Sequence, residues 1–336
     1  MTCRLSICIP TYNRGAYIEE TLRSILDQAD DGIEIVVSDN ASTDDTQAIV
    51  ERLARESGRI QYFRWERNMG ADRNFLKVVE IANGEYCWLM GSDDRVEPGG
   101  VEGVLAIIGA NPGLGGITTN VASYDPQLKR RILMPPQTEF TNDHRFEDGA
   151  ESFRTLGHWL GFLSAQIVSR EAWNEVVREC DLLPYHNAYV HIFVIAQIMR
   201  RRASWYYAVA TLVGWRSGND SFLAEGVFKR LSIDVVGYER ITGDVFGRDS
   251  DVYREIMKAV MSIHVRSALL GAKARNADTS FFLRALRLCV HQYWRYPTFW
   301  LHVFPIFCMP RFVYLGARWL YRVTLKPMRM RRIGTH

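Results

Sequence analysis

Two adjacent carboxylates stand at the end of an apolar run in the stretch CWLMGSDDR, residues 87–95. The run predicts a buried strand, and Asp93 and Asp94 come just after it. Neighbouring carboxylates in such a place repel each other unless a cation or positive side chains neutralise them. A divalent metal carrying a diphosphate would do so, because Mg²⁺ and Mn²⁺ prefer hard oxygen ligands. The alternative is a solvated turn before a helix that begins near Pro98.

Polar residues also follow two other apolar runs. LSICI (5–9) leads into PTYNR, and IEIVVS (33–38) leads into DNAS. Together the three strand ends would place an aromatic ring, a lone carboxylate and a carboxylate pair along one edge of a sheet. Asp39 has a second interpretation, because SDNASTDDT is rich in residues that form Asx turns and helix N-caps.

Alternating strands and helices must position these strand ends. The periodicity predicts strands at 5–9, 33–38, 60–65 and 85–90, and helices at 17–28, 44–56 and 71–83. Short connections between them favour right-handed βαβ units and a parallel sheet buried between helices. Ligands of such sheets bind beyond the carboxyl ends of the strands.

The composition favours a folded, intracellular protein. The 336 residues, 47% hydrophobic and 24% charged, suffice for a large core. The six cysteines are scattered, without CxxC pairs or zinc-ligand spacing, so we expect neither a disulfide framework nor a zinc site. The first residues lack the pattern of a secretion signal, and we expect a cytoplasmic setting.

The charge is distributed unevenly along a chain whose formal net charge is +3. Asp278 is the last acidic residue, and ten Lys or Arg residues follow it in a segment rich in aromatic residues. A basic, aromatic segment on an otherwise acidic chain indicates an anionic partner, either nucleic acid or lipid head groups.

Four motifs in order make the first 110 residues resemble a known family. They are SICIPTYNRGAYIEETLRSIL, IEIVVSDNASTDDT, RNMGADRNF and GEYCWLMGSDDRVEPGGV. They resemble family 2 glycosyltransferases, most closely the O-antigen branch that includes abequosyltransferases. The resemblance implies an α/β GT-A fold, with a Rossmann-like nucleotide-binding sheet flanked by helices, and the periodicity adds a helical C-terminal region.

The resemblance also implies a set of binding residues. Pro10, Tyr12 and Asp39 would grip the base and ribose of a nucleotide-sugar donor, and Ser92 would lie near the ribose. The other expected substrate contacts are Thr11, Arg14, Asn40, Asn68, Gly70, Arg73, Asn219 and Ser221. For Arg73 the alternative is an ordinary surface arginine on a helix.

Metal binding is expected at the acidic motif. Asp93 and Asp94 would hold Mg²⁺ or Mn²⁺. Many relatives have an aspartate where this chain has Gly91, so a metal-independent variant stays an alternative.

Two further residues are candidates for catalysis. Arg216, in the loop VGWRSGNDSF, would stabilise the charge of the departing nucleotide, unless it is a surface residue without a role. Inverting transfer needs a base beside the acceptor hydroxyl. His191, on a predicted helix at 188–201, stands near the place of the family's aspartate base. A packed core histidine is the alternative, with Asp181 and Asp220 as substitute bases.

The predicted organisation has three parts. Residues 1–220 form the glycosyltransferase domain, with a donor half at 1–110 and an acceptor half at 111–220. A helical region follows at 221–295, and an amphipathic, membrane-associating tail follows at 296–336. We expect an inverting enzyme of surface-polysaccharide synthesis whose saccharide acceptor is linked to polyprenyl diphosphate. A sugar nucleotidyltransferase and a nucleic-acid-binding protein are alternatives. The first lacks its glycine-rich phosphate loop, and the acidic body argues against a nucleic-acid partner.

The end of the chain has the pattern of a helix from Arg311 to Lys326. Arginines fall on one face, small and aliphatic residues lie opposite, and aromatic residues flank the boundary, as in a helix lying in a membrane interface. The uncharged stretch at 296–310 is broken by prolines and too short to span a bilayer. We therefore expect attachment to the cytoplasmic face of a bacterial inner membrane. The alternatives are a core helix with an exposed basic side and an oligomer contact.

Overall fold

The chain forms two compact units. The computed structural model describes residues 3–29, 32–132, 138–202, 204–220, 222 and 226–320. The first unit comprises residues 1–220 and 240–253, and the second comprises residues 221–239 and 254–336. The division predicted from the sequence, with boundaries after residues 220 and 295, stays a prediction.

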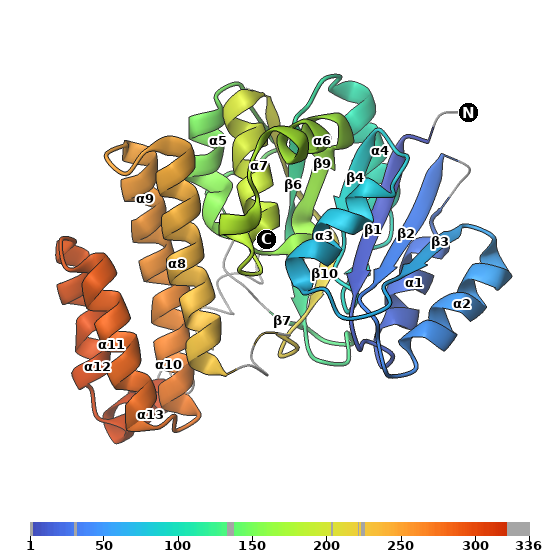
Figure 1. The fold of residues 1–336 in the computed structure, drawn as a ribbon. Helices are drawn as coiled ribbons and strands as arrows, with labels where there is room; N and C mark the ends of the chain where they lie inside the picture. The colour runs from blue at the N-terminus through green and yellow to red at the C-terminus, as the bar shows by residue number, and fades with distance from the viewer. Residues whose placement is uncertain are drawn as a thin grey trace. The chain divides into compact units, whose positions relative to one another are not determined.

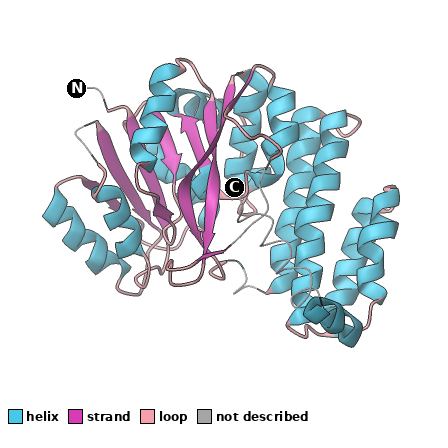
Figure 2. Cartoon of the chain, turned by 180° about the vertical axis from the view of Figure 1, so that it is seen from behind, coloured by secondary structure: helices cyan, strands magenta, loops and turns pink. Residues whose placement is uncertain are grey.

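A mixed sheet of ten strands forms the centre of the first unit, in the part of the chain that the structure describes (Figure 2). The strand order is β3-β2-β1-β4-β9-β6-β10-β5, with β7 beside β6 and β8 beside β10. The strands are β1 Leu5–Thr11, β2 Ile33–Asp39, β3 Ile60–Arg64, β4 Tyr86–Leu89, β5 Arg95–Val96, β6 Gly116–Tyr124, β7 Arg131–Ile132, β8 His144–Phe146, β9 Gln166–Ser169 and β10 Trp205–Arg216.

The four strands predicted from the first 90 residues are parallel, as expected. Their register brings Thr11 beside Asp39 and Asp39 beside Arg64 at one edge of the sheet. β9 runs antiparallel between β4 and β6, so these two strands point the same way, and β10 is parallel to β6. The carboxyl ends of β1, β2, β4, β6 and β10 therefore meet at this edge, which we call the carboxyl edge.

Helices cover both faces of the sheet (Figure 1). Helices α1, α2 and α4 bury apolar residues in the core on one face, and α3, α6 and α7 pack on the other, with α5 against α7. The helices of this unit are α1 Ile18–Leu26, α2 Thr46–Ser57, α3 Ala71–Glu80, α4 Gly100–Ala110, α5 Gly149–Leu156, α6 Arg170–Glu179 and α7 Val190–Arg201, with short 3₁₀ turns η1 Gly157–Trp159, η2 Leu163–Ala165 and η3 Leu183–Tyr185.

The central strands have apolar side chains on both faces because helices cover both. All seven residues of β1 are buried, and Leu5, Ile7 and Ile9 point into the core with α1. Trp88 of β4 is fully buried, and its indole N–H donates to the carbonyl of Ser164 at 2.8 Å. This bond ties the end of β4 to the turn before β9.

The described part of the second unit contains helices joined by short turns, and no strand. Helices α8 and α9 contribute to both units. The elements are α8 Val227–Phe246, α9 Asp251–Val260, the π-helical η5 Met261–Val265, α10 Arg266–Ala274, α11 Thr279–Tyr293, the π-helical η6 Phe299–Val303, α12 Phe304–Cys308 and α13 Arg311–Leu320. Among the described residues, no single helix has the length and hydropathy to cross a bilayer; the pair at 299–308 and 311–320 qualifies only when joined across a bend of 111°.

Candidate active site

Asp94 is enclosed at the end of β4. It is buried, and its two carboxylate oxygens accept hydrogen bonds from the Ser164 hydroxyl at 2.5 Å and from the backbone N–H of Arg216 at 3.0 Å. Burial and the neighbouring charge of Asp93 raise the pKa of Asp94 to about 8, although both hydrogen bonds favour the carboxylate. Asp94 therefore stabilises the turn at 91–94 and presents little surface to a ligand.

Asp93 is the more accessible member of the pair, with 19% of its side chain exposed. Its carboxylate accepts a hydrogen bond from the Asn219 amide at 2.6 Å and lies 3.9 Å from the Arg14 guanidinium. Burial raises the pKa of Asp93, and the charges of Arg14 and Arg216 act in the opposite direction. The carboxyl edge thus gathers Asp93 with two residues predicted as substrate contacts.

Arg216 lies at the end of β10, and each of the three nitrogens of its guanidinium donates a hydrogen bond. Its nitrogens donate to the Asp93 carbonyl at 2.8 Å, the Pro126 carbonyl at 2.6 Å and the Glu20 carboxylate at 2.6 Å. The guanidinium carbon also lies 4.9 Å from the centre of the Tyr17 ring. In this conformation Arg216 holds the acidic turn against α1. Its predicted contact with a leaving group stays a prediction, and Ser221 lies outside the described residues.

Gly91, at the position where the resemblance predicts an acid, is closely packed. A Cβ atom here would lie 3.0 Å from both the Asp94 carboxylate and the Ser164 hydroxyl. The Gly91 backbone N–H donates to that same hydroxyl at 2.9 Å. A larger residue would push Ser164 or Asp94 out of this arrangement.

The donor set fits a divalent metal only in part. Asp93 can offer an oxygen, whereas both oxygens of Asp94 are already engaged. Among the residues that the structure describes, no group of three or more His, Cys, Asp or Glu could hold a metal ion. Mg²⁺ often takes one or two carboxylates and completes its shell with water and substrate phosphates. The residues therefore fit a metal held by Asp93 together with a diphosphate, and Asp94 does not fit as a ligand in this conformation.

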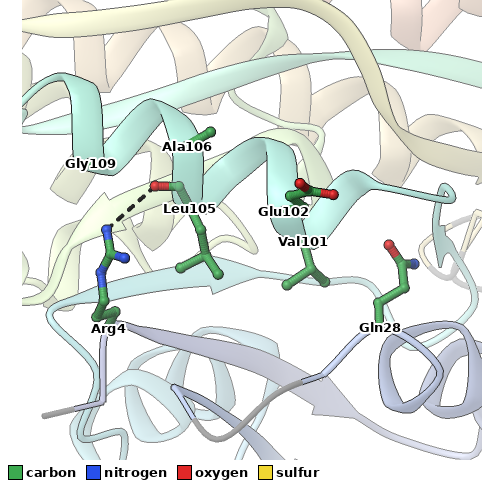
Figure 3. A pocket seen from close by; sticks show the side chains of 7 residues that line it. All are labelled: Arg4, Gln28, Val101, Glu102, Leu105, Ala106 and Gly109. Carbon is green, nitrogen blue, oxygen red and sulfur yellow. Dashed lines mark hydrogen bonds between the residues drawn. The ribbon is translucent and has the colours of Figure 1, made fainter. Parts of the chain in front are cut away.

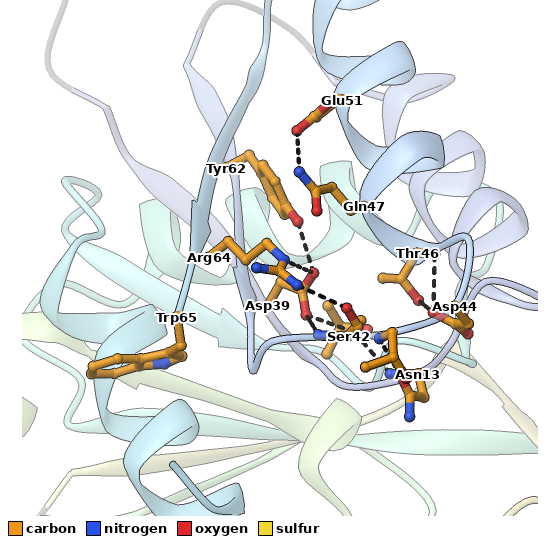
Figure 4. Close-up of polar contacts among 12 residues, drawn as sticks. Asn13, Asp39, Ser42, Asp44, Thr46, Gln47, Glu51, Tyr62, Arg64 and Trp65 are labelled. Atoms are coloured by element: carbon orange, nitrogen blue, oxygen red, sulfur yellow. Dashed lines mark hydrogen bonds and ion pairs between the residues drawn. The ribbon is translucent and has the colours of Figure 1, made fainter. Parts of the chain in front are cut away.

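Asp39, at the end of β2, is buried at the centre of a second polar group (Figure 4). One carboxylate oxygen accepts from the backbone N–H and hydroxyl of Ser42, at 2.8 and 2.6 Å. The other accepts from the Tyr62 hydroxyl at 2.7 Å, with the Arg64 guanidinium 3.7 Å away. The Asp39 side chain thus closes the turn at 39–42 through the N–H three residues on, which is neither an Asx turn nor the N-cap of α2, and its contact with a nucleotide stays a prediction.

The loop after β3 lies beside this group. Asn40 is buried; its amide donates to Asn68 at 2.9 Å and its oxygen accepts from the Met69 backbone at 2.7 Å. Gly70 has a φ of 86°, which few other residues adopt, and its N–H donates to Asn68. Arg73 is exposed at the start of α3. Except for Arg73, these predicted contacts form one hydrogen-bonded group.

The segment after β1 links the two polar groups. The backbone N–H of Asn13 donates to Ser42 at 2.9 Å, on the Asp39 side. Arg14 follows and reaches toward Asp93. Pro10, Thr11 and Ser92 are buried, and Tyr12 exposes its ring with 42% of the residue accessible. An exposed aromatic ring at the carboxyl edge is suited to stacking on a base.

Several supporting residues could not be predicted from the sequence. Asn74 of α3 donates to the Thr11 and Ser38 carbonyls, at 3.3 and 2.8 Å, and so joins the ends of β1 and β2. Asn74 follows Arg73 within the motif RNMGADRNF, but nothing in the sequence shows which backbone groups it contacts. Ser164, Glu20, Tyr62 and Arg64 gave no signal, because each acts through a partner distant in sequence.

His191 lies on α7 in an apolar environment. It is buried, and the rings of Phe75 and Tyr189 lie edge-on at 5.2 and 5.9 Å. Within the described part of the chain, neither ring nitrogen makes a hydrogen bond of ordinary geometry. Burial lowers the pKa of His191 to about 4, and the nearby Leu160 carbonyl offsets only part of this effect. His191 is therefore neutral at pH 7 and able to accept a proton, but only as a weak base.

The start of α7 is fixed by an acid on α3. Asp72 accepts hydrogen bonds from the backbone N–H groups of Ala188 and Val190, at 2.8 and 3.0 Å. Burial raises the pKa of Asp72. The substitute bases are less confined: Asp181 is exposed and accepts from the Leu183 backbone, and Asp220 is exposed.

Two pockets lie away from this edge. One, of about 410 Å³, is lined by Arg4, Gln28 and one side of α4, near the start of β1 (Figure 3). The other, of about 780 Å³, is lined by residues at the start of β4 and by α6. Neither contains a predicted site residue. The carboxyl edge is the candidate site because of its charged and polar side chains, and not because of the volume of a pocket.

Comparison with known proteins identifies relatives. Residues 6–165 match the family model described as glycosyl transferase family 2. The abequosyltransferase RfbV of Salmonella typhimurium is 30% identical over 260 residues, which are 74% of this chain and 78% of that protein. A Campylobacter jejuni GalNAc(5)-diNAcBac-PP-undecaprenol beta-1,3-glucosyltransferase is 32% identical over 103 residues, 30% of this chain and 33% of that protein.

Solved structures share the fold. Staphylococcus aureus TarS 1–349 in complex with UDP-GlcNAc matches with a TM-score of 0.59 and 16% identity, over 87% of this chain and 82% of that one. The mannosyltransferase PcManGT of Pyrobaculum calidifontis, in complex with GDP-Man and Mn²⁺, matches with a TM-score of 0.53 and 15% identity, over 88% of both chains.

Proposed function

The chain belongs to glycosyltransferase family 2 and has the GT-A fold, and from this premise we propose that it moves a sugar from a nucleotide-sugar donor to a saccharide acceptor with inversion. The predicted family, fold and enzyme class are confirmed. The donor, the acceptor, the stereochemistry and the roles of individual residues belong to the proposal.

The donor would lie along the carboxyl edge. The TarS and PcManGT structures are complexes with nucleotide sugars, which supports this class of donor. The exposed ring of Tyr12 is available to the base, and Asn40 and Asn68 shape the adjoining loop. Arg14, between the Asp39 group and Asp93, is placed to reach the diphosphate.

Asp93 would hold a divalent metal, Mg²⁺ or Mn²⁺, together with the donor diphosphate. The PcManGT complex contains Mn²⁺, which supports a metal of this kind. When bound, the ion neutralises the negative charge that grows on the diphosphate as the sugar departs. Arg216 keeps the turn in place, and Asn219 orients the carboxylate of Asp93.

Transfer with inversion would be a single displacement. The acceptor hydroxyl oxygen bonds to the anomeric carbon while the bond from that carbon to the diphosphate oxygen breaks, and the nucleoside diphosphate leaves. A base takes the proton of the hydroxyl. In this proposal His191 takes the proton, as expected from its place in the sequence, because burial keeps its ring neutral at pH 7; its low pKa makes it a weak base, and Asp181 and Asp220 remain the alternatives.

The acceptor would be a saccharide on polyprenyl diphosphate, used for an O-antigen-like surface polysaccharide. The similarity to an abequosyltransferase and to a glucosyltransferase whose name contains PP-undecaprenol supports this assignment. The two other functions considered from the sequence, a nucleotidyltransferase and a nucleic-acid-binding protein, gain no support from the comparisons.

The observation that carries the proposal is the position of Asp93, partly exposed at the carboxyl edge between Arg14 and Asn219. A panel of nucleotide sugars, tested with Mg²⁺ or Mn²⁺, would examine it. We expect at least one donor to raise the melting temperature and to be slowly hydrolysed, and chelator to remove both effects. If no donor binds while nucleoside triphosphate and sugar phosphate react to release pyrophosphate, the protein is a nucleotidyltransferase instead.

A further inference from the structure

Helix α13 contributes no residue to any core. None of its ten residues, Arg311–Leu320, is buried. Only Tyr314 and Arg318 are partly covered. At the start of the helix the Arg311 guanidinium donates to the Lys273 and Ala274 carbonyls, at 3.2 and 3.4 Å, at the end of α10. The helix is therefore attached to its unit through the side that carries its arginines.

The opposite side of α13 is apolar and exposed. At about 100° per residue, one arc of the helix carries Phe312, Val313, Leu315, Gly316, Trp319 and Leu320. We call this arc the α13 face. Phe312 is 77% exposed, Trp319 65% and Leu320 54%. Within 311–320 the apolar side is the open one, which disagrees with a core helix that exposes its basic side; residues 321–326 lie outside the described residues.

An apolar face of this kind is costly in water. Burying a large apolar side chain is worth about 1.5–3 kcal/mol, and an isolated helix of fewer than about 12 residues is marginal. A helix that leaves five large apolar residues exposed therefore gains stability from whatever covers them. On the neighbouring η6, Trp300 and Leu301 are exposed as well, at 43% and 69%.

The charge around the α13 face is of one sign. Among the described residues after Asp278 there is no acid, and five arginines lie there: Arg284, Arg287, Arg295, Arg311 and Arg318. A second protein would more often supply complementary acids to a few defined positions. An anionic bilayer accepts positive charge anywhere along its surface and accepts Trp, Phe and Leu beneath it.

We propose that the α13 face inserts into the interface of an anionic bilayer, with α13 lying in the membrane plane. A helix of ten residues is about 15 Å long, enough for interfacial attachment and too short to span the bilayer. The cytoplasmic leaflet is the anionic one, so attachment there agrees with the location expected from the sequence. This inference does not depend on the proposed reaction.

Vesicle flotation with the full chain tests the proposal. The wild type should float with vesicles of phosphatidylcholine and phosphatidylglycerol, less with phosphatidylcholine alone, and less at high salt. Replacing Phe312, Leu315 and Trp319 together by Gln should weaken binding by about 100-fold or more. The control, Leu183→Gln, changes a leucine of the first unit that is 69% exposed, and it should bind as the wild type.

A label in the α13 face tells a membrane from other occupants. Gly316 has open space where a Cβ would lie, so Gly316→Cys, in a Cys308→Ser background, can carry an environment-sensitive dye. The emission should be that of an exposed dye in buffer and should shift to an apolar environment on adding anionic vesicles.

Three outcomes would overturn the proposal. The first is a wild type that does not float with anionic vesicles. The second is a triple variant that floats as well as the wild type. The third is a dye already in an apolar environment without vesicles: concentration-dependent emission would indicate a second copy of the chain, and concentration-independent emission would indicate the chain's own residues.

Discussion

His191 shows how a single buried residue can be tested through pH. The folded protein holds its pKa near 4, whereas the unfolded chain takes up a proton near pH 6.5. Unfolding is therefore favoured as the pH falls below about 6.5, and this contribution is lost at high pH because both states are then neutral.

The variant His191→Gln should remove this contribution. Between about pH 7.5 and about pH 5.5, the wild type should lose about 1 kcal/mol of unfolding free energy relative to the variant. Urea denaturation at several pH values measures the difference. As a control, replacing the exposed His291 by Gln should leave the change in unfolding free energy between these pH values as in the wild type. Parallel pH profiles for wild type and His191→Gln would contradict the buried neutral ring.

The same variant tests the proposed base. If His191 accepts the proton of the acceptor hydroxyl, His191→Gln should reduce turnover by about 10² or more while donor binding is retained. Near-normal turnover would assign the role to Asp181 or Asp220. Because donor binding and stability are measured on the same preparation, loss of fold is distinguished from loss of the base.

The Asp39 carboxylate accepts hydrogen bonds from Ser42 and Tyr62, and the contribution of the Tyr62 bond to stability can be measured. We expect Tyr62→Phe to lower the unfolding free energy by about 1–3 kcal/mol, since a buried carboxylate oxygen loses its hydroxyl donor. Thermal or urea denaturation measures this. Phe63→Leu, a change in the same strand away from the carboxylate, is the control. An unchanged stability would mean that the Tyr62 bond is not maintained in solution.

At the scale of elements, the early part of the chain was predictable, and in the middle the helix predicted at 188–201 matches α7, whereas one short strand was not predicted. The first four strands and three helices agree with the prediction because the strands are short, mostly apolar runs and the helices carry a period of about 3.6. β9 was missed: it has four residues, too few to show a period, and its place between β4 and β6 is set by pairing with strands far away in sequence.

The same limit applies to the site. The sequence indicated the carboxyl edge, since three polar segments follow predicted strands. The sequence did not indicate that the Arg216 guanidinium donates hydrogen bonds to Glu20 and to two carbonyls. These contacts depend on β10 ending beside α1. Arg311–Leu320 confirms a helix at the start of the predicted 311–326 segment, and the remainder, with Arg322 and Lys326, lies outside the described residues.

The turn after β4 and the turn before β9 contact each other through Gly91, Asp94 and Ser164. A double-variant cycle tests whether this contact stabilises the fold. Gly91→Ala should cost about 1–3 kcal/mol, because the new methyl group meets Ser164 and Asp94 at 3.0 Å. Ser164→Gly alone should also destabilise, since Asp94 and the Gly91 N–H lose their partner. The combined variant should be more stable than the sum of the two losses predicts, by about 0.5 kcal/mol or more.

Strict additivity in this cycle would contradict the contact between the two turns. Gly100→Ala combined with Ser164→Gly serves as the control pair, because a Cβ at Gly100 meets Val96 and Leu212 and not Ser164. Denaturant midpoints of the four proteins in each cycle provide the data.

At the scale of the whole molecule, the two units carry different tasks in this account. The first unit holds the carboxyl edge, where Asp93, Arg14 and Asn219 meet. The second unit holds the α13 face, which we propose inserts into the interface of an anionic membrane. A polyprenyl-linked acceptor is itself held in a membrane, so attachment of the enzyme would keep it near its substrate. Variants of the α13 face should therefore lower transfer to a lipid-linked acceptor while leaving donor hydrolysis unchanged.

The central claim, that Asp93 serves a metal-bound donor diphosphate at the carboxyl edge, is tested most directly by Asp93→Asn. Burial raises the pKa of Asp93, so the neutral amide should leave the fold intact. Calorimetric titration with the nucleoside diphosphate of the active donor should show, for the wild type, affinity that increases with Mn²⁺. For Asp93→Asn this increase should vanish and turnover should fall about 100-fold or more, whereas the exposed Asp27→Asn should match the wild type. Metal-enhanced binding and full turnover in Asp93→Asn would contradict the account.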